Sequence, residues 1–291
     1  MSFRFRTLSL TVGLVTGSIC SVAQAVPISA QVESSVTITS NGVTNSSANG
    51  PSSIALSSLS DYQSPSYSSG VANGYDTGRT YLTSSSNHND GTVTSSVHHF
   101  ASITNNTGSE QSFTFSFLIN EGSLSNSTSY NTVKGLDYIS SSYFADILVN
   151  GVSIWSSGAT LTTNAAGSSL SKTGQDLSTY TDGASYYSWS PFSSLVNLGS
   201  FADGETFTLD YYLSTTVSNL TVNSGCENYG YGCMASAQFG DPYGLDLSPI
   251  DEATVAIVEK TVTVPEPAGL VLLGAGLAGL AFRRRAKKTC N

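Results

Sequence analysis

The chain has 291 residues and a formal net charge of −9 at pH 7, and only 11% of its residues are charged. Residues 26–263 contain four basic residues against nineteen acidic ones, so this central region carries a net charge of −15. Such a surface repels nucleic acid and anionic lipid, which excludes nucleic acid as a partner. The central region is long enough to bury a substantial core within one domain.

The first 25 residues have the pattern of a signal peptide. Arg4 and Arg6 supply a positive start, residues 8–19 form an apolar stretch, and a small-x-small site ends at Ala25. We therefore predict a signal peptide over residues 1–25 and cleavage after Ala25. Cleavage after Ala30 is the alternative, and either cut implies that the chain is exported.

Residues 40–73 are dense in Ser, Asn and Gly. Such a composition is typical of long surface loops, with one short strand expected over residues 54–59.

Strand patterns dominate the chain beyond this point. Residues 112–117 alternate strictly, which places three phenylalanines on one face of a half-buried strand. Asn150-Gly151 predicts a two-residue hairpin turn. Residues 206–213 place Phe207, Leu209 and Tyr211 on one face. Further strands are expected over residues 92–103, 143–149, 152–155, 234–239 and 254–264.

No stretch before residue 268 shows sustained helical periodicity. We predict that residues 26–263 form a single all-β domain, an antiparallel β-sandwich or jelly-roll-like fold.

The three histidines are His88, His98 and His99. His98 and His99 are adjacent in an expected strand, so their side chains point to opposite faces and cannot share one metal ion.

Catalytic patterns are weak. No Gly-x-Ser-x-Gly sequence occurs, and the nearest carboxylate pairs are Asp203 with Glu205 and Asp251 with Glu252. The first pair lies in an expected turn, where Asp and Gly are favoured for backbone reasons. We predict no enzymatic activity. The alternative is a glycoside hydrolase that uses two carboxylates.

An aromatic cluster lies between residues 180 and 192. Tyr186, Tyr187 and Trp189 are its candidate carbohydrate-binding residues, because sugars stack on exposed aromatic faces. Neighbouring side chains in a strand alternate in direction, so packing of some of these rings in the core is the competing interpretation.

Cys226 and Cys233 are the two cysteines outside the terminal segments. In an exported chain they predict a disulfide that closes a small Gly/Tyr loop. The loop-entropy model gives such a bond about 2.5 kcal/mol of stabilisation. Metal ligation and a reactive thiol pair are the alternatives.

Asp241, Asp246 and Asp251 recur in a loop-rich stretch, where oxygen ligands suit calcium. Their spacing matches no EF-hand, so they are weak calcium candidates beside the simpler interpretation as solvated turn carboxylates. No other cofactor is predicted.

The C-terminal segment predicts a membrane-retention device. An apolar run of 15 residues, 268–282, is followed by a basic stop at residues 283–288. As an α-helix the run would measure about 22 Å, which is short against a hydrocarbon core of about 30 Å. The basic residues predict that this end stays on the cytoplasmic side.

Residues 264–291 resemble the PEP-CTERM sorting domain of exported bacterial proteins. The resemblance rests on the tripeptide Pro265-Glu266-Pro267, the Gly/Ala/Leu-rich run and the cluster Arg283-Arg284-Arg285. It implies that a membrane enzyme of the exosortase type recognises the tripeptide and removes the helix. The precursor would then be anchored in the inner membrane, and the mature domain would be periplasmic, cell-surface or extracellular.

The expected function is therefore that of an exported, non-enzymatic surface or extracellular-matrix protein. Adhesion or association with exopolysaccharide is the expected task. The alternative is a secreted polysaccharide-active hydrolase on the same β-sandwich scaffold.

Overall fold

The computed structural model describes residues 25–27, 31–63, 66–76, 80–87, 91–127, 138–177, 180–182, 185–220, 233–240 and 254–258. This part of the chain is all-β and contains no helix. Accordingly, it has no helix that is long and apolar enough to cross a membrane. The predicted helix 268–282 and the predicted signal peptide, except for Ala25, lie outside the described residues.

In chain order, the first nine strands are β1 (Ala25–Pro27), β2 (Gln31–Ser40), β3 (Val43–Ser52), β4 (Ile54–Gln63), β5 (Ser66–Tyr75), β6 (Thr80–Asn87), β7 (Gly91–Thr104), β8 (Gln111–Ile119) and β9 (Gly122–Ser127). The others are β10 (Tyr138–Val149), β11 (Val152–Asn164), β12 (Gly167–Gly174), β13 (Tyr180–Asp182), β14 (Tyr186–Trp189), β15 (Phe192–Phe201), β16 (Thr206–Leu220), β17 (Met234–Phe239) and β18 (Thr254–Val258).

These strands form three sheets. Sheet 1 has the order β12-β11-β10-β16-β7-β2-β3, and sheet 2 has the order β13-β14-β9-β17-β6-β5-β4. Sheet 3 has four strands in the order β1-β18-β8-β15. Every pair of neighbouring strands is antiparallel. The prediction of an antiparallel all-β fold is confirmed.

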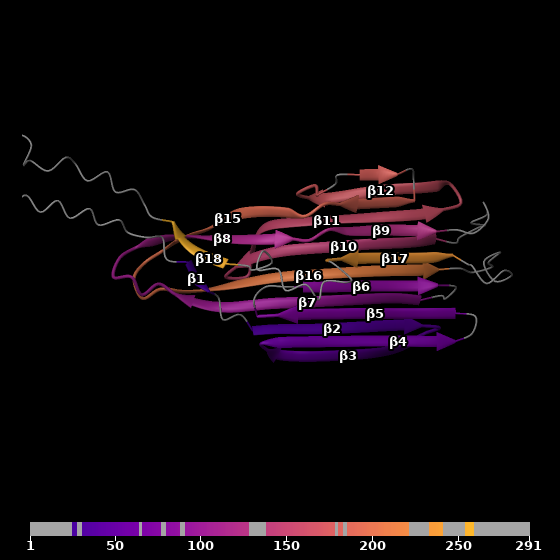
Figure 1. Ribbon diagram of the computed structural model, residues 1–291, viewed down its shortest axis with the longest axis horizontal. Coiled ribbons are helices and arrows are strands. Elements are labelled where there is room, and N and C mark those ends of the chain that lie inside the picture. The colour runs from indigo at the N-terminus through magenta and orange to yellow at the C-terminus, as the bar shows by residue number, and fades with distance from the viewer. Residues whose placement is uncertain are drawn as a thin grey trace, which may run out of the picture.

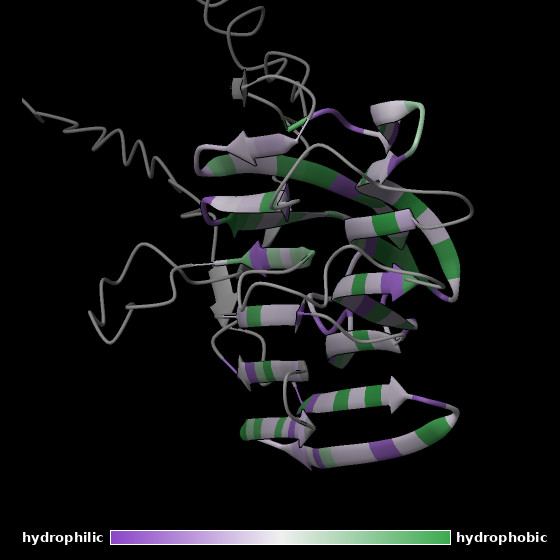
Figure 2. Ribbon diagram, turned by 90° about the vertical axis from the view of Figure 1, so that its right-hand side faces the viewer, coloured by the Kyte–Doolittle hydropathy of each residue, from purple (hydrophilic) through white to green (hydrophobic). Residues whose placement is uncertain are grey.

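Sheets 1 and 2 pack face to face. Strand β2 contacts β5, β7 contacts β6, and β16 contacts β17 across the interface. The long strands lie along the long axis of the molecule, with β8, β15, β1 and β18 toward one end (Figure 1). Seen along the strands, they form facing layers (Figure 2). This arrangement of two antiparallel sheets around a shared core is that of a β-sandwich.

One part of the interface is filled by small side chains. Valines of sheet 1, such as Val36 and Val97, meet glycines of sheet 2. A Cβ atom at Gly70 or at Gly74 would overlap valine side chains, so only glycine permits this close approach. Buried serines share this part of the interface, and Ser34 Oγ lies 2.9 Å from Ser57 Oγ of the opposite sheet.

The expectation of loops over residues 40–73 is wrong. This stretch instead forms β3, β4 and most of β5. At Gly70 of β5 the valines of the opposing sheet leave no room for a side chain, whereas most residues of the edge strand β3 are exposed. Tertiary packing overrides the low strand propensity of Gly, Ser and Asn.

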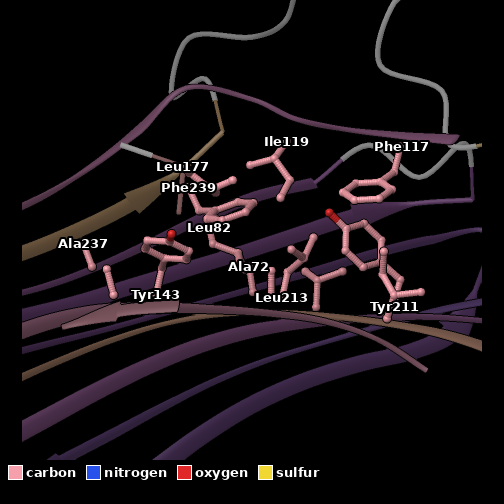
Figure 3. Packing of buried hydrophobic residues seen from close by; sticks show 14 of the residues in the cluster. Ala72, Leu82, Phe117, Ile119, Tyr143, Leu177, Tyr211, Leu213, Ala237 and Phe239 are labelled. Atoms are coloured by element: carbon pink, nitrogen blue, oxygen red, sulfur yellow. The ribbon is translucent and has the colours of Figure 1, made fainter. Parts of the chain in front are cut away.

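The other part of the core is aromatic. Phe113, Phe115 and Phe117 of β8 are all buried, as their alternation predicts, and so are Phe207 and Tyr211 of β16. Figure 3 shows Phe117 close to Tyr211, and Phe239 close to Tyr143. The rings of Phe117 and Tyr211 have centroids 5.7 Å apart.

The predicted hairpin turn is confirmed. Asn150 and Gly151 have φ values of 50° and 76° and join β10 to β11. Positive φ at both central residues is the requirement of the type I′ turn that Asn-Gly favours.

Candidate functional site

The aromatic segment of β14 is divided between the core and the surface. Tyr187 and Trp189 are 0% and 2% exposed, whereas Tyr186 is 37% exposed. Two of the three predicted carbohydrate-binding rings therefore offer no free face to a sugar. The competing interpretation, packing in the core, holds for Tyr187 and Trp189, and only Tyr186 keeps the exposure that stacking requires.

Trp189 is fixed from several sides. Its ring centroid lies 4.4 Å from that of Tyr143 and 5.6 Å from that of Phe239. Its indole Nε1–H donates a hydrogen bond of 2.9 Å to the carbonyl oxygen of Asn120. Gly122 lies against the indole so closely that a Cβ atom there would overlap it. The indole is therefore a structural anchor between the sheets.

A shallow depression of about 570 Å³ opens beside β14. The register places Ser188 opposite Ser123, and Ser123 opposite Gln238, on three neighbouring strands. Tyr186 and Glu121 line the depression with them, and Trp189 forms part of its wall. One exposed ring beside hydroxyl, amide and carboxylate groups gives a small polar ligand a stacking face and hydrogen-bonding partners.

The adjacent histidines point to opposite faces, as predicted. His99 is 5% exposed, and its Nε2 lies 2.7 Å from Thr80 Oγ1. Burial, reinforced by the neighbouring His98, lowers the pKa of His99 from 6.5 to about 4. The third histidine, His88, lies outside the described residues.

His98 belongs to a surface cluster that the sequence did not reveal. Its Nε2 lies 2.9 Å from Asp210 Oδ1, and its Nδ1 lies 3.9 Å from Glu33 Oε2. The imidazole stacks on Tyr212, with centroids 3.9 Å apart and planes 8° apart. These residues come from β2, β7 and β16, and only the strand register brings them together.

The carboxylate pair in the turn before β16 has structural partners. Asp203 Oδ1 accepts a hydrogen bond of 2.8 Å from the backbone N–H of Gly108, and Glu205 Oε2 accepts one of 2.8 Å from that of Ala202. Both carboxylates therefore bind backbone N–H groups, which agrees with the interpretation of this pair as turn residues. Asp251 and Glu252 lie outside the described residues.

The calcium candidates Asp241, Asp246 and Asp251 also lie outside the described residues. Within the part of the chain that the structure describes, no three or more His, Cys, Asp or Glu side chains form a group that could hold a metal ion. Cys233 is buried and disulfide-bonded. Its predicted partner Cys226 is outside the described ranges, so the pairing of these two cysteines stays a prediction.

The residues predicted to direct sorting, Pro265 to Pro267 and Arg283 to Arg285, lie outside the described residues. Residues 263–285 match the family model of the PEP-CTERM protein-sorting motif. No curated protein matches the chain. The match confirms the resemblance of the tail, and the motif implies an exported protein, transiently anchored in the membrane and sorted by an exosortase-type system.

Proposed function

We propose that this chain is a non-enzymatic surface or extracellular-matrix protein that associates with exopolysaccharide after its tail has been processed. The observation that carries the proposal is the sorting motif at residues 263–285. A protein delivered outside the cell by a removable tail works where extracellular polysaccharide is found. The antiparallel strands of the described domain provide a scaffold that can present a binding surface.

The tail acts as a temporary tether in this proposal. The apolar run 268–282 holds the precursor in the inner membrane, and the basic stop 283–288 keeps the end of the chain on the cytoplasmic side. A cut near Pro265 to Pro267 then separates the acidic domain from its anchor. The domain carries −15, which favours solubility and diffuse association with cations.

We expect Glu266→Ala to leave export intact and to block removal of the tail, because the central carboxylate of the tripeptide is the group that distinguishes it chemically. Cell fractions are compared by immunoblotting and intact mass, with Glu259→Ala as the matched control upstream of the motif. Accumulation of full-length Glu266→Ala in the membrane supports the proposal. Processing equal to that of the unmodified chain contradicts it.

The depression beside β14 is the proposed polysaccharide contact. Tyr186 offers an exposed ring, and Ser188 and Gln238 offer a hydroxyl and an amide on neighbouring strands. Glu121 is the one carboxylate among the residues that line the depression. Glycoside hydrolysis ordinarily uses a pair of carboxylates, so this geometry favours binding over the hydrolase alternative.

We expect Tyr186→Ala to weaken retention on the preferred glycan of a glycan array. The loss should be about twofold to twelvefold, which corresponds to the roughly 0.5–1.5 kcal/mol that an aromatic contact contributes. Tyr212→Ala is the matched control, because Tyr212 is 40% exposed on the opposite sheet. Equal binding by all three proteins would remove this depression from the proposal.

A further inference from the structure

The outer face of sheet 1 carries hydroxyl side chains in two rows. In each row, one hydroxyl residue from each of the seven strands lies directly opposite its neighbour in the next strand. The first row is Ser46, Thr37, Thr94, Thr216, Ser142, Thr160 and Ser171. The second row is Thr44, Thr39, Thr92, Ser218, Ser140, Thr162 and Ser169.

The β-sheet fixes the spacing of this hydroxyl array. Neighbouring strands lie about 4.8 Å apart, and residues i and i+2 on one strand lie roughly 6.7 Å apart. The two rows are related by i and i+2, as in Thr37 and Thr39 or Thr92 and Thr94. The fourteen side chains therefore form a two-dimensional array whose repeats are those of the strand spacing and of the i, i+2 spacing.

Hydrogen bonds between strands orient the hydroxyls. Thr94 Oγ1 lies 3.1 Å from Thr216 Oγ1, and Thr39 Oγ1 lies 3.0 Å from Thr44 Oγ1. A hydroxyl has one donor and two acceptor positions, so such a bond leaves capacity for a partner outside the protein. Eight of the fourteen residues are threonines, whose branched side chains have restricted χ1 angles.

The chemistry of the hydroxyl array selects one class of ligand. None of its residues is charged, so the array has no complement for an ionic polymer. None is aromatic, so it offers no stacking platform for a sugar. Its aromatic and charged neighbours, including Tyr212, His98 and Glu33, lie in separate rows of the same face. A repeating surface of donors and acceptors, with threonine methyl groups between them, instead matches an ordered layer of water.

We propose that the hydroxyl array on sheet 1 orders water in rows and thereby binds the surface of ice. Ordered waters that bridge polar groups are enthalpically close to direct hydrogen bonds and carry a small entropic cost. The strand spacing and the i, i+2 spacing are of the same order as the oxygen repeats of the ice lattice. The inference requires export of the chain, because ice forms outside cells first. It does not depend on polysaccharide binding.

The opposite sheet supplies the control. On the outer face of sheet 2, Thr83 of β6 lies opposite Gln238 and Val71, which interrupt the hydroxyl row there. Thr94 of β7 lies opposite Thr37 and Thr216, in the middle of an unbroken row. Thr83→Tyr and Thr94→Tyr therefore place the same bulky ring on the outer faces of the two sheets, and only Thr94→Tyr disrupts the hydroxyl array.

The test is partition of the protein into slowly growing ice. The full chain is purified in a nonionic detergent, and a detergent-only blank and serum albumin are frozen in parallel. We expect enrichment in the ice fraction of about tenfold over albumin, which corresponds to about 1.4 kcal/mol. Thr83→Tyr should keep this enrichment, and Thr94→Tyr should fall to the albumin value.

Circular dichroism shows whether each variant is folded. If Thr94→Tyr fails to fold, Thr94→Lys takes its place, since it adds a charge to the array with a flexible side chain. Exclusion of the unmodified protein from ice would overturn the inference, and so would equal partition of the Thr83 and Thr94 variants. A third outcome would also overturn the inference: the unmodified protein does not partition into ice, and Thr94→Tyr loses binding to the glycan array. That result would assign this face of sheet 1 to sugar binding.

Discussion

Replacing Trp189 with Ala should lower the free energy of unfolding by about 3–5 kcal/mol, the usual cost of deleting a large buried aromatic side chain. The indole is 2% exposed and packs against Tyr143 and Phe239. Its removal also takes away the hydrogen-bond donor of the Asn120 carbonyl. Because the ring lies between strands of both large sheets, the surrounding backbone has little freedom to collapse into the cavity.

Urea unfolding followed by circular dichroism measures this loss. The chain contains one other tryptophan, Trp155, which is half-buried and packs near Phe117. Trp155→Ala is therefore the matched control and should have a clearly smaller effect. If the two variants lost the same stability, Trp189 would not be the anchor that its burial indicates. The exclusion of Trp189 from sugar stacking would then have to be reconsidered.

The β14 segment shows how far alternation carries a prediction. The sequence predicts correctly that Tyr186 and Tyr187 point to opposite faces, but alternation alone does not say which face is buried. Pairing of β14 with β9, which is more than fifty residues earlier in the chain, decides this. In β8 the sequence also indicates which side is buried. Three phenylalanines lie on one side of the strand, and threonine and serine lie on the other, so the phenylalanine side is the hydrophobic one.

Residues 40–73 show the opposite case, in which local composition misleads. Gly70 and Gly74 look like turn residues, yet their backbones lie inside strand β5. They are required by the valines of sheet 1, which approach from strands that are distant in sequence. At these two positions, glycine is a consequence of the narrow space between two sheets and does not mark a loop.

The His98 cluster and the hydroxyl array depend on the register of strand pairing more strongly than the core does. His98 and Asp210 are separated by 112 positions, and no local pattern links them. The hydroxyl array has a visible local signal, the repeated pairs of Ser or Thr at i and i+2, such as Thr37 with Thr39 and Thr160 with Thr162. That signal indicates strands with one polar face, but only the pairing of seven strands shows that the pairs are aligned.

Acid should destabilise the fold through His99. Burial lowers the pKa of His99 from 6.5 to about 4. Between these values the unfolded chain binds a proton that the folded chain does not, and stability rises with pH wherever the unfolded state binds more protons. The stability associated with neutral His99 is therefore present above pH 6.5 and is lost as the pH falls toward 4. The expected loss is about 3 kcal/mol, from 1.36 kcal/mol per pKa unit.

The free energy of unfolding should be measured by urea titration at several pH values between 7 and 4, in the unmodified protein and in His99→Phe. A phenyl ring retains the contact with Tyr211, whose ring centroid lies 6.0 Å from that of His99, but cannot take up a proton. Carboxylates titrate in both proteins, so the difference between the two curves isolates His99. This difference should change by about 3 kcal/mol over the range, in favour of His99→Phe at low pH. Parallel curves would mean that His99 is accessible to protons in the folded state, which its burial beneath Thr80 and Tyr211 argues against.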